Sequence, residues 1–485
     1  MRYWLRNADR VFIGGSFVGR YDILVENGRI ARIEPSSAQV TRDGDFDLSG
    51  KTLLPALWDV HVHFFQTGIR AVEFDAGGFT EEEALFSGIE LWLADHRGVN
   101  GYGFSPPDDG ALPTRSRLDA ISRDKPIFIR RIDGHSSCAN SRALAEFGSI
   151  LADTKGFDFE TGLLALEAQT IADRFMLSKM TERELRESAK AVANSALMAG
   201  CANIGALVPN ARWLGILLET ELPIKVLPRL ETLLPEEAVA IGVERVGGCM
   251  PMVDGAFGSR TALLSEPYSD MPDCFGASEI TQLELNRWFF EAGTLGLSTA
   301  THAIGDAAVD MILQSVRRTR GMRPKCVRIE HAELLRDDQI DEIAKLGISL
   351  AVQPVFESIW GGPEGMYSRR LGERWRSTNR FRDLLDAGVP LAGSSDSYIT
   401  PIDPLAGVRA AVRHPNRRQA VSLDEAIEMF STMSAIVEGE ADDRGDIAVG
   451  KAADFAVVEG ECLSETSEVV ATIVNGKIEF GGING

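Results

Sequence analysis

The sequence predicts an α/β protein: a (β/α)₈ TIM-type barrel with a small β-sandwich domain formed from both termini and an insertion after barrel strand 1. Three observations lead to this prediction. Eight short apolar stretches alternate with longer amphipathic stretches, the two ends of the chain share one strand-turn-strand pattern, and one interval between predicted strands is unusually long. Eight is the number of parallel strands that closes a barrel.

The predicted barrel strands are short and rich in buried-type residues, as expected for a parallel sheet covered on both faces. In chain order they are LPALWDVHVHF, GCANIGAL, PIKVLPRLE, GCMPMVDGAF, GLSTATHA, CVRIEHA, ISLAVQPV and VPLAGSSD.

The two ends of the chain read as short strands joined by tight turns at Asn27-Gly28 and Asn475-Gly476. Because neither end buries a core alone, we predict one composite β domain from residues 1–55 and 441–485. The barrel then occupies residues 56–440. The interval 65–190 is too long for one βα connection and is interpreted as an insertion with a lid-like segment.

Composition narrows the class of protein. The 485 residues include 50 Lys and Arg against 71 Asp and Glu, a net charge of −21 that disfavours nucleic-acid binding. No apolar run has the length of a membrane span, and the N-terminus lacks the pattern of a signal peptide, so a cytoplasmic protein acting on a small molecule is expected. The six scattered cysteines are typical of free thiols in a reducing compartment.

Two histidines lie at the end of the first predicted barrel strand. His61 and His63 are two residues apart, so in a strand both side chains face the same side. Two imidazoles on one face suit a metal ion, although a pair of hydrogen-bonded core histidines gives the same pattern.

Further polar residues close other predicted strands. His302 ends LSTATHA, His331 ends VRIEHA and Asp396 ends PLAGSSD. Since the C-terminal ends of barrel strands meet at one mouth, we expect these side chains to join His61 and His63. Imidazoles and a carboxylate favour Zn²⁺, with Mn²⁺ and Fe²⁺ as alternatives.

The longer motifs resemble those of the amidohydrolase superfamily, and most closely its family 3 branch, which includes N-substituted formamide deformylases. The resemblance rests on LPALWDVHVH, RIDGHSSCANSRAL, VDGAFGSRTALL, THAIGDAAVD, RIEHAELL, LAVQP, AGSSD and GKAADFAVV. It implies a hydrolase in which a metal activates water and Asp396 acts as base and proton shuttle.

One departure from the family pattern concerns the number of metal ions. Members with two metals usually carry a carbamylated lysine four residues before the aspartate of the DG motif, and here that place is Met250, before Asp254. A thioether does not replace the carbamate, and strand parity turns the adjacent Cys249 away. We therefore predict one metal ion per chain, with His331 nearby as a further ligand or an oxyanion stabiliser; the expected ligands are His61, His63, His302 and Asp396.

The substrate side is predicted from three motifs that also match the family. His135 in the insertion is expected to hydrogen-bond a substrate carbonyl oxygen, although a loop histidine satisfied by local backbone fits as well. Asp254 and Arg260 follow the fourth strand, where Arg260 pairs with a substrate carboxylate or pins its own loop. Gln353 on the seventh strand binds substrate or makes a structural hydrogen bond.

The predicted activity is hydrolysis of a non-peptide C–N bond in a linear amide, N-acyl or N-formyl compound, with Asp396 as general base. The alternatives are a single-metal aminohydrolase or cyclic amide hydrolase, and a degenerate barrel that only binds. A homodimer is expected solely because it is the commonest assembly of soluble enzymes.

Overall fold

The computed structural model describes residues 1–36, 44–106, 111–131, 136–152, 154–319 and 324–482. The chain divides into two compact units, which are described separately. One comprises Met1–Phe64 and Val192–Gly485, and the other comprises Phe65–Ala191.

The first unit is built around an eight-stranded parallel sheet, which confirms the predicted barrel class. Its first and last strands approach one another through a parallel bridge between Val62 and Ser397, so the sheet is nearly closed. In sheet order the strands are β21 (Leu391–Gly393), β20 (Ser349–Val352), β19 (Val327–His331), β18 (Ser298–Ala303), β17 (Arg245–Met252), β16 (Lys225–Leu230), β15 (Cys201–Val208) and β8 (Leu57–His63).

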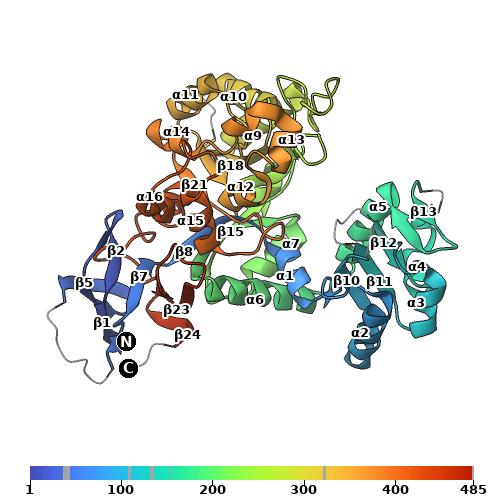
Figure 1. Ribbon diagram of the computed structural model, residues 1–485, viewed down its shortest axis with the longest axis horizontal. Helices are drawn as coiled ribbons and strands as arrows, with labels where there is room; N and C mark the ends of the chain where they lie inside the picture. The colour runs from blue at the N-terminus through green and yellow to red at the C-terminus, as the bar shows by residue number, and fades with distance from the viewer. Residues whose placement is uncertain (37–43, 107–110, 132–135, 153, 320–323, 483–485) are drawn as a thin grey trace. The chain divides into compact units, whose positions relative to one another are not determined.

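Helices connect successive barrel strands (Figure 1). They start where the sequence supplies capping groups: Thr281 and Ser422 form capping boxes, and prolines occupy the first turns of the helices at 354 and 404. The helices of this unit are α7 (Ala211–Leu218), α8 (Glu236–Ala240), α9 (Gln282–Thr294), α10 (Asp306–Arg318), α11 (Asp337–Leu346), α12 (Pro354–Trp360), α13 (Met366–Leu371), η3 (Gly372–Ser377), α14 (Phe381–Asp386), α15 (Pro404–Val412), α16 (Leu423–Met429) and α17 (Thr432–Glu438).

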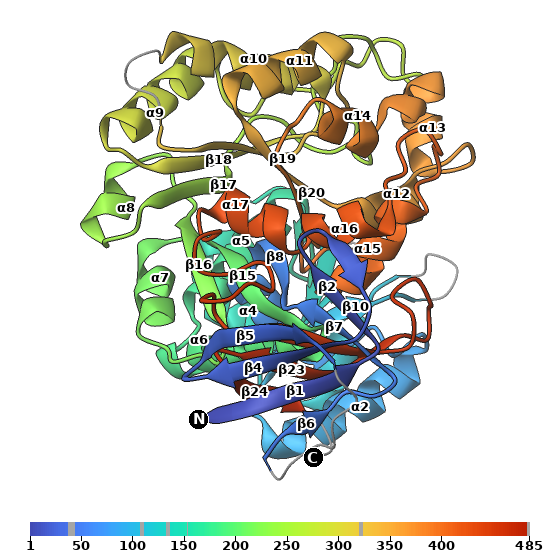
Figure 2. The same cartoon turned by 90° about the vertical axis from the view of Figure 1, so that its left-hand side faces the viewer.

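Strands from both ends of the chain form two further sheets that lie together, as Figure 2 shows for β1, β4, β23 and β24. Buried residues of both sheets, including Leu5, Ile23, Phe455 and Ile473, share one core, as expected for a sandwich. One sheet contains β5 (Arg29–Pro35), β4 (Tyr21–Glu26), β1 (Arg2–Ala8) and β6 (Phe46–Asp47); the other contains β24 (Lys477–Gly481), β23 (Glu468–Val474), β22 (Phe455–Glu459), β7 (Lys51–Pro55), β2 (Arg10–Ile13) and β3 (Ser16–Val18).

The second unit, Phe65–Ala191, has a mixed six-stranded sheet and its own buried clusters around Leu85 and Phe128. Its strands, in sheet order, are β13 (Phe157–Asp158), β14 (Leu163–Ala165), β12 (Ser136–Ala139), β11 (Ile127–Arg131), β10 (Val99–Phe104) and β9 (Phe74–Asp75). Its helical segments are α2 (Glu82–Asp95), α3 (Arg115–Ile121), α4 (Ser141–Phe147), η2 (Gly148–Leu151) and α5 (Leu166–Ser178), while α1 (Phe64–Val72) and α6 (Glu182–Met198) cross its boundaries.

Among the described residues, no helix is both long enough and apolar enough to cross a membrane.

A glycine on β15 tests how tightly this strand packs against β8. A Cβ at Gly205 would lie 2.3 Å from the carbonyl oxygen of Val60, so Gly205→Ala forces the two strands apart. We expect it to lower the free energy of unfolding by about 1–3 kcal/mol in denaturant titrations. Gly19→Ala is the control because a Cβ there meets nothing within 4 Å. Equal stability of both variants would contradict the close approach.

Candidate metal centre

The four histidines and the aspartate predicted from the sequence come together at the C-terminal ends of the barrel strands. His61 and His63 end β8, His302 and His331 end β18 and β19, and Asp396 follows β21. The ring centroids of His61 and His331 lie 5.0 Å apart, and those of His302 and His331 lie 4.5 Å apart. Potential ligand atoms of His61, His331 and Asp396 lie within 4.8 Å of one another.

Asp396 lies beside the first histidine pair. Its Oδ1 is 3.3 Å from His61 Nε2 and 3.1 Å from His63 Nε2. Burial raises the pKa of this carboxyl, but the charges of the two histidines and their hydrogen bonds outweigh burial and lower it well below its usual range. The group is therefore an anionic carboxylate at the mouth of the barrel.

Backbone geometry at two strand ends aims these side chains. His331 has a φ of 70° and Asp396 a φ of 56°, both in the left-handed region that residues other than glycine rarely adopt. Such conformations cost about 1–3 kcal/mol each and cluster at functional sites. Asp59 helps to hold the second of them, since its Oδ1 accepts a hydrogen bond of 3.0 Å from the backbone N–H of Ser395.

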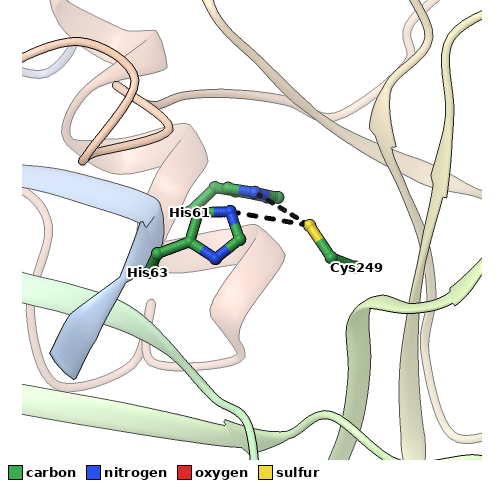
Figure 3. A group of neighbouring side chains, drawn as sticks. All are labelled: His61, His63 and Cys249. Carbon is green, nitrogen blue, oxygen red and sulfur yellow. Dashed lines mark hydrogen bonds between the residues drawn. The ribbon is translucent and has the colours of Figure 1, made fainter. Parts of the chain in front are cut away.

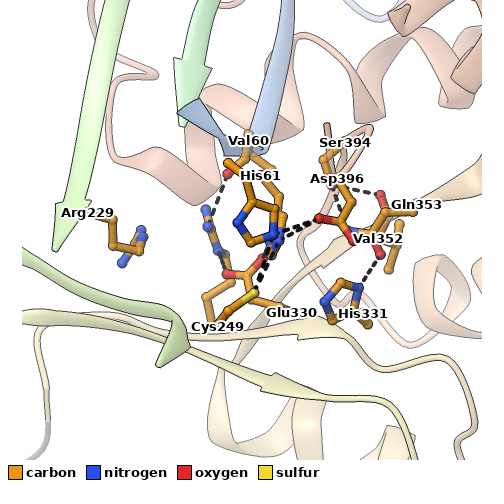
Figure 4. Close-up of polar contacts among 12 residues, drawn as sticks. Val60, His61, Arg229, Cys249, Glu330, His331, Val352, Gln353, Ser394 and Asp396 are labelled. Carbon is orange, nitrogen blue, oxygen red and sulfur yellow. Dashed lines mark hydrogen bonds and ion pairs between the residues drawn. The ribbon is translucent and has the colours of Figure 1, made fainter. Parts of the chain in front are cut away.

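Glu330 is a site residue that was not predicted from the sequence. His61 Nδ1 donates a 2.6 Å hydrogen bond to Glu330 Oε2; both residues are labelled in Figure 4. Arg328 Nε donates a 2.6 Å bond to Glu330 Oε1. Burial raises the pKa of the Glu330 carboxyl, but the charges of Arg328 and His61 lower it to about 2. An ionised carboxylate on Nδ1 leaves the Nε2 lone pair of His61 free for a metal.

Gln353 orients another histidine in the same way. His331 Nδ1 donates a 2.8 Å hydrogen bond to Gln353 Oε1, and Gln353 Nε2 donates a 3.0 Å bond to Ser394 Oγ. The opposite nitrogen, His331 Nε2, is buried without a hydrogen-bond partner among the described residues, and so is His302 Nδ1. Unpartnered buried nitrogens that face other ligand-type atoms fit a bound cation.

Cys249 also lies in this group, which corrects the expectation from strand parity. Its Sγ is 3.9 Å from His61 Nε2 and 3.6 Å from His63 Nε2 (Figure 3). Burial raises the pKa of the thiol, but the charge of His63 and the contacts with the surrounding histidines lower it well below its usual value. Met250, expected at this place, is instead 42% exposed.

An irregularity in β17 explains the reversed parity. Gly247 and Gly248 have φ values of 93° and 126°, and the register with β18 shifts between Gly248 and Met252. Strict alternation therefore ends before Cys249. The two adjacent glycines, at the start of the predicted strand, are the sequence signal that could have revealed this bulge.

The residues predicted to bind substrate have the following surroundings. Asp254 is fully buried, and its carboxylate accepts hydrogen bonds from the backbone N–H groups of three residues, Leu263, Ile304 and Gly305. Arg260 forms a two-point ion pair with Asp270. These contacts, like that of Gln353 with His331, are structural, and binding of substrate by the three residues stays a prediction. His135 lies outside the described residues.

Comparison with known proteins places the chain in a family. A model described as "Amidohydrolase family" matches residues 46–480. The chain belongs to the amidohydrolase family. This amidohydrolase is 26% identical to the putative amidohydrolase YtcJ of Bacillus subtilis, over 90% of each chain. It is 24% identical to the N-substituted formamide deformylase of Arthrobacter pascens, over 94% of each chain.

Solved structures resemble the amidohydrolase chain over nearly its whole length. An uncharacterized metal-dependent hydrolase from Pyrococcus horikoshii is 29% identical, with a TM-score of 0.81 over 96% of this chain and 98% of its own. A second, from Pyrococcus furiosus, is 27% identical, with a TM-score of 0.83 over 96% of this chain and 100% of its own. The family and the nitrogen, oxygen and sulfur donors of the cluster together support a metal-dependent hydrolase.

The hydrogen bond from His61 to Glu330 is tested by Glu330→Gln. Without the carboxylate, His61 is less strongly favoured in the form with its proton on Nδ1 and Nε2 free. We therefore expect zinc affinity to fall about 10–100-fold in chelator competition. Asp22→Asn is the matched control because Asp22 is a buried carboxylate paired with Arg6 in the β sandwich. Wild-type affinity in the folded Glu330→Gln protein would argue against this role.

Proposed function

We propose that this amidohydrolase hydrolyses a non-peptide C–N bond in a linear amide, N-acyl or N-formyl compound. The observation that supports this proposal most strongly is a cluster at the barrel mouth in which only one side chain, that of His63, is partly exposed; its members are His61, His63, His302, His331 and Asp396. The name of the relative from Arthrobacter pascens, which spans the same length, suggests the N-formyl class as the first to test.

The cluster has the donors that a zinc ion prefers. His61, His63 and Asp396 offer two imidazoles and a carboxylate, and His302 and His331 have unpartnered nitrogens. When bound, zinc lowers the pKa of a water molecule to about 7 and polarises a carbonyl oxygen. Zinc as the ion, a homodimer and a cytoplasmic location stay predictions from the sequence.

Asp396 is proposed to move the proton during hydrolysis. Its carboxylate accepts a proton from the attacking water as the oxygen bonds to the carbonyl carbon. The same carboxyl then donates that proton to the leaving nitrogen as the C–N bond breaks, giving an acid and an amine. The left-handed backbone at Asp396 and the bond from Ser395 to Asp59 keep the carboxylate aimed at this position.

Activity is tested on a panel of N-formyl amines, N-acyl amines and linear amides, with protein stripped of metal and reloaded with Zn²⁺. We expect turnover of at least one linear class, lost on stripping and restored on reloading. Ammonia release from ring compounds alone would instead support the aminohydrolase alternative, and no turnover of any class by the metal-loaded protein would favour the binding-only alternative.

Asp396→Asn tests the proton-transfer role on the substrate that this panel identifies. Because an amide does not accept the proton of water, we expect kcat to fall about 10²–10⁴-fold. Metal content is measured on the same samples, so that loss of zinc is distinguished from loss of the base. An Asn variant that binds metal and keeps wild-type kcat would contradict the role of Asp396.

A further inference from the structure

The thiol of Cys249 lies between two pairs of histidines. It belongs to one set of close ligand atoms with His61 and His63, and to a second set with His302 and His331. Within each set all ligand atoms lie within 4.8 Å of one another. Cys249 is the member that these two histidine pairs have in common.

Each histidine pair also has features of a metal half-site. The pair from β8 shares the Asp396 carboxylate, at 3.3 Å and 3.1 Å. The pair from β18 and β19 offers His302 Nδ1 and His331 Nε2, which are buried and lack hydrogen-bond partners in the described part of the chain. With Cys249 the cluster offers six donor residues, and His61, His331 and Asp396 also form a close set, so the donors exceed the four that a single zinc ion usually takes.

We propose that the Cys249 thiolate bridges two metal ions, one held by His61, His63 and Asp396 and the other by His302 and His331. This inference rests on the proposed metal-dependent function and replaces the expectation of one ion per chain. A thiolate is a good zinc ligand, with bonds of about 2.3 Å. Two such bonds from one sulfur reach ions about 3.5–4 Å apart, the spacing of two-metal hydrolytic sites.

The chain holds the sulfur in place through contacts on both sides of the bulge. The backbone N–H of Cys249 donates a 2.9 Å hydrogen bond to Glu231 Oε1, directly after β16. A Cβ at Gly247 would lie 2.0 Å from the carbonyl oxygen of Ala300, so only glycine allows this approach to β18. The thiol consequently occupies the place that the sequence pattern assigned to Met250, whose side chain is exposed.

The thiol loses its proton to solvent when the ions bind, because a coordinating thiol is deprotonated. No oxidant or reductant takes part. The alternative is that Cys249 is a structural residue that binds no metal. In that case sulfur is absent from the zinc coordination shell.

The test is zinc stoichiometry together with X-ray absorption at the zinc edge, on full-length protein loaded with Zn²⁺ and freed of excess metal. We expect two zinc ions per wild-type chain and a zinc–sulfur shell at about 2.3 Å. Cys249→Ala should hold at most one ion and show no sulfur. Cys249→Asp supplies a carboxylate in place of the thiolate, so this variant should bind two ions with no zinc–sulfur shell. It keeps the test decisive if the Ala variant fails to fold.

Two variants serve as controls. Cys201→Ala removes a buried thiol from the neighbouring strand β15, and Met250→Lys changes the adjacent exposed side chain; both should retain two ions and the sulfur shell. One ion or none per wild-type chain, or a wild-type shell without sulfur, overturns the bridge. If the protein binds two zinc ions with sulfur in their shell but hydrolyses no substrate, the proposed function is wrong and the bridge is retained. If it hydrolyses substrate with one ion and no sulfur, the bridge is wrong and the proposed function is retained.

Discussion

The metal centre depends on a buried line of charges that continues beneath it. Glu330 accepts hydrogen bonds from His61 and Arg328, and Arg328 continues to the Glu438 carboxylate at the end of α17. All four side chains are nearly or fully excluded from solvent, so each charge is costly unless its partners remain in place. The imidazole of His61 is thereby fixed in one orientation by groups that come from two other elements, β19 and α17. Removal of any partner would leave a buried charge without compensation.

The barrel supplies the remaining alignment through the ends of its strands. Side chains from β8, β18, β19 and the segment after β21 converge because parallel strands place their C-terminal ends at one mouth. At positions where the regular alternation of a strand would point a side chain away from the site, the backbone conformation is irregular. His331 follows Glu330 directly, and its left-handed φ lets both reach the site. The bulge before Cys249 has the same effect on β17. The strained backbone conformations therefore lie at the positions where catalysis is expected.

Much of the fold could be predicted from the sequence, because buried parallel strands carry a strong apolar signal. Each of the eight barrel strands overlaps its predicted stretch, although β15 ends one residue later and β17 begins three residues earlier than predicted. His61, His63, His302, His331 and Asp396 were found by one rule, that polar residues closing such strands share the barrel mouth. That rule assumes regular strands, so it missed Cys249, which a bulge turns inward. It also misses Glu330, which directly precedes the predicted ligand His331 within the stretch CVRIEHA. Neither departure follows from periodicity, since each depends on local backbone angles.

The most direct test of a metal centre at this mouth is anomalous diffraction at the zinc edge from crystals of the zinc-loaded protein. We expect strong anomalous density between the side chains of His61, His63 and Asp396. Zinc density only elsewhere on the protein, with these three side chains still in direct contact with one another, would contradict a metal centre at this mouth.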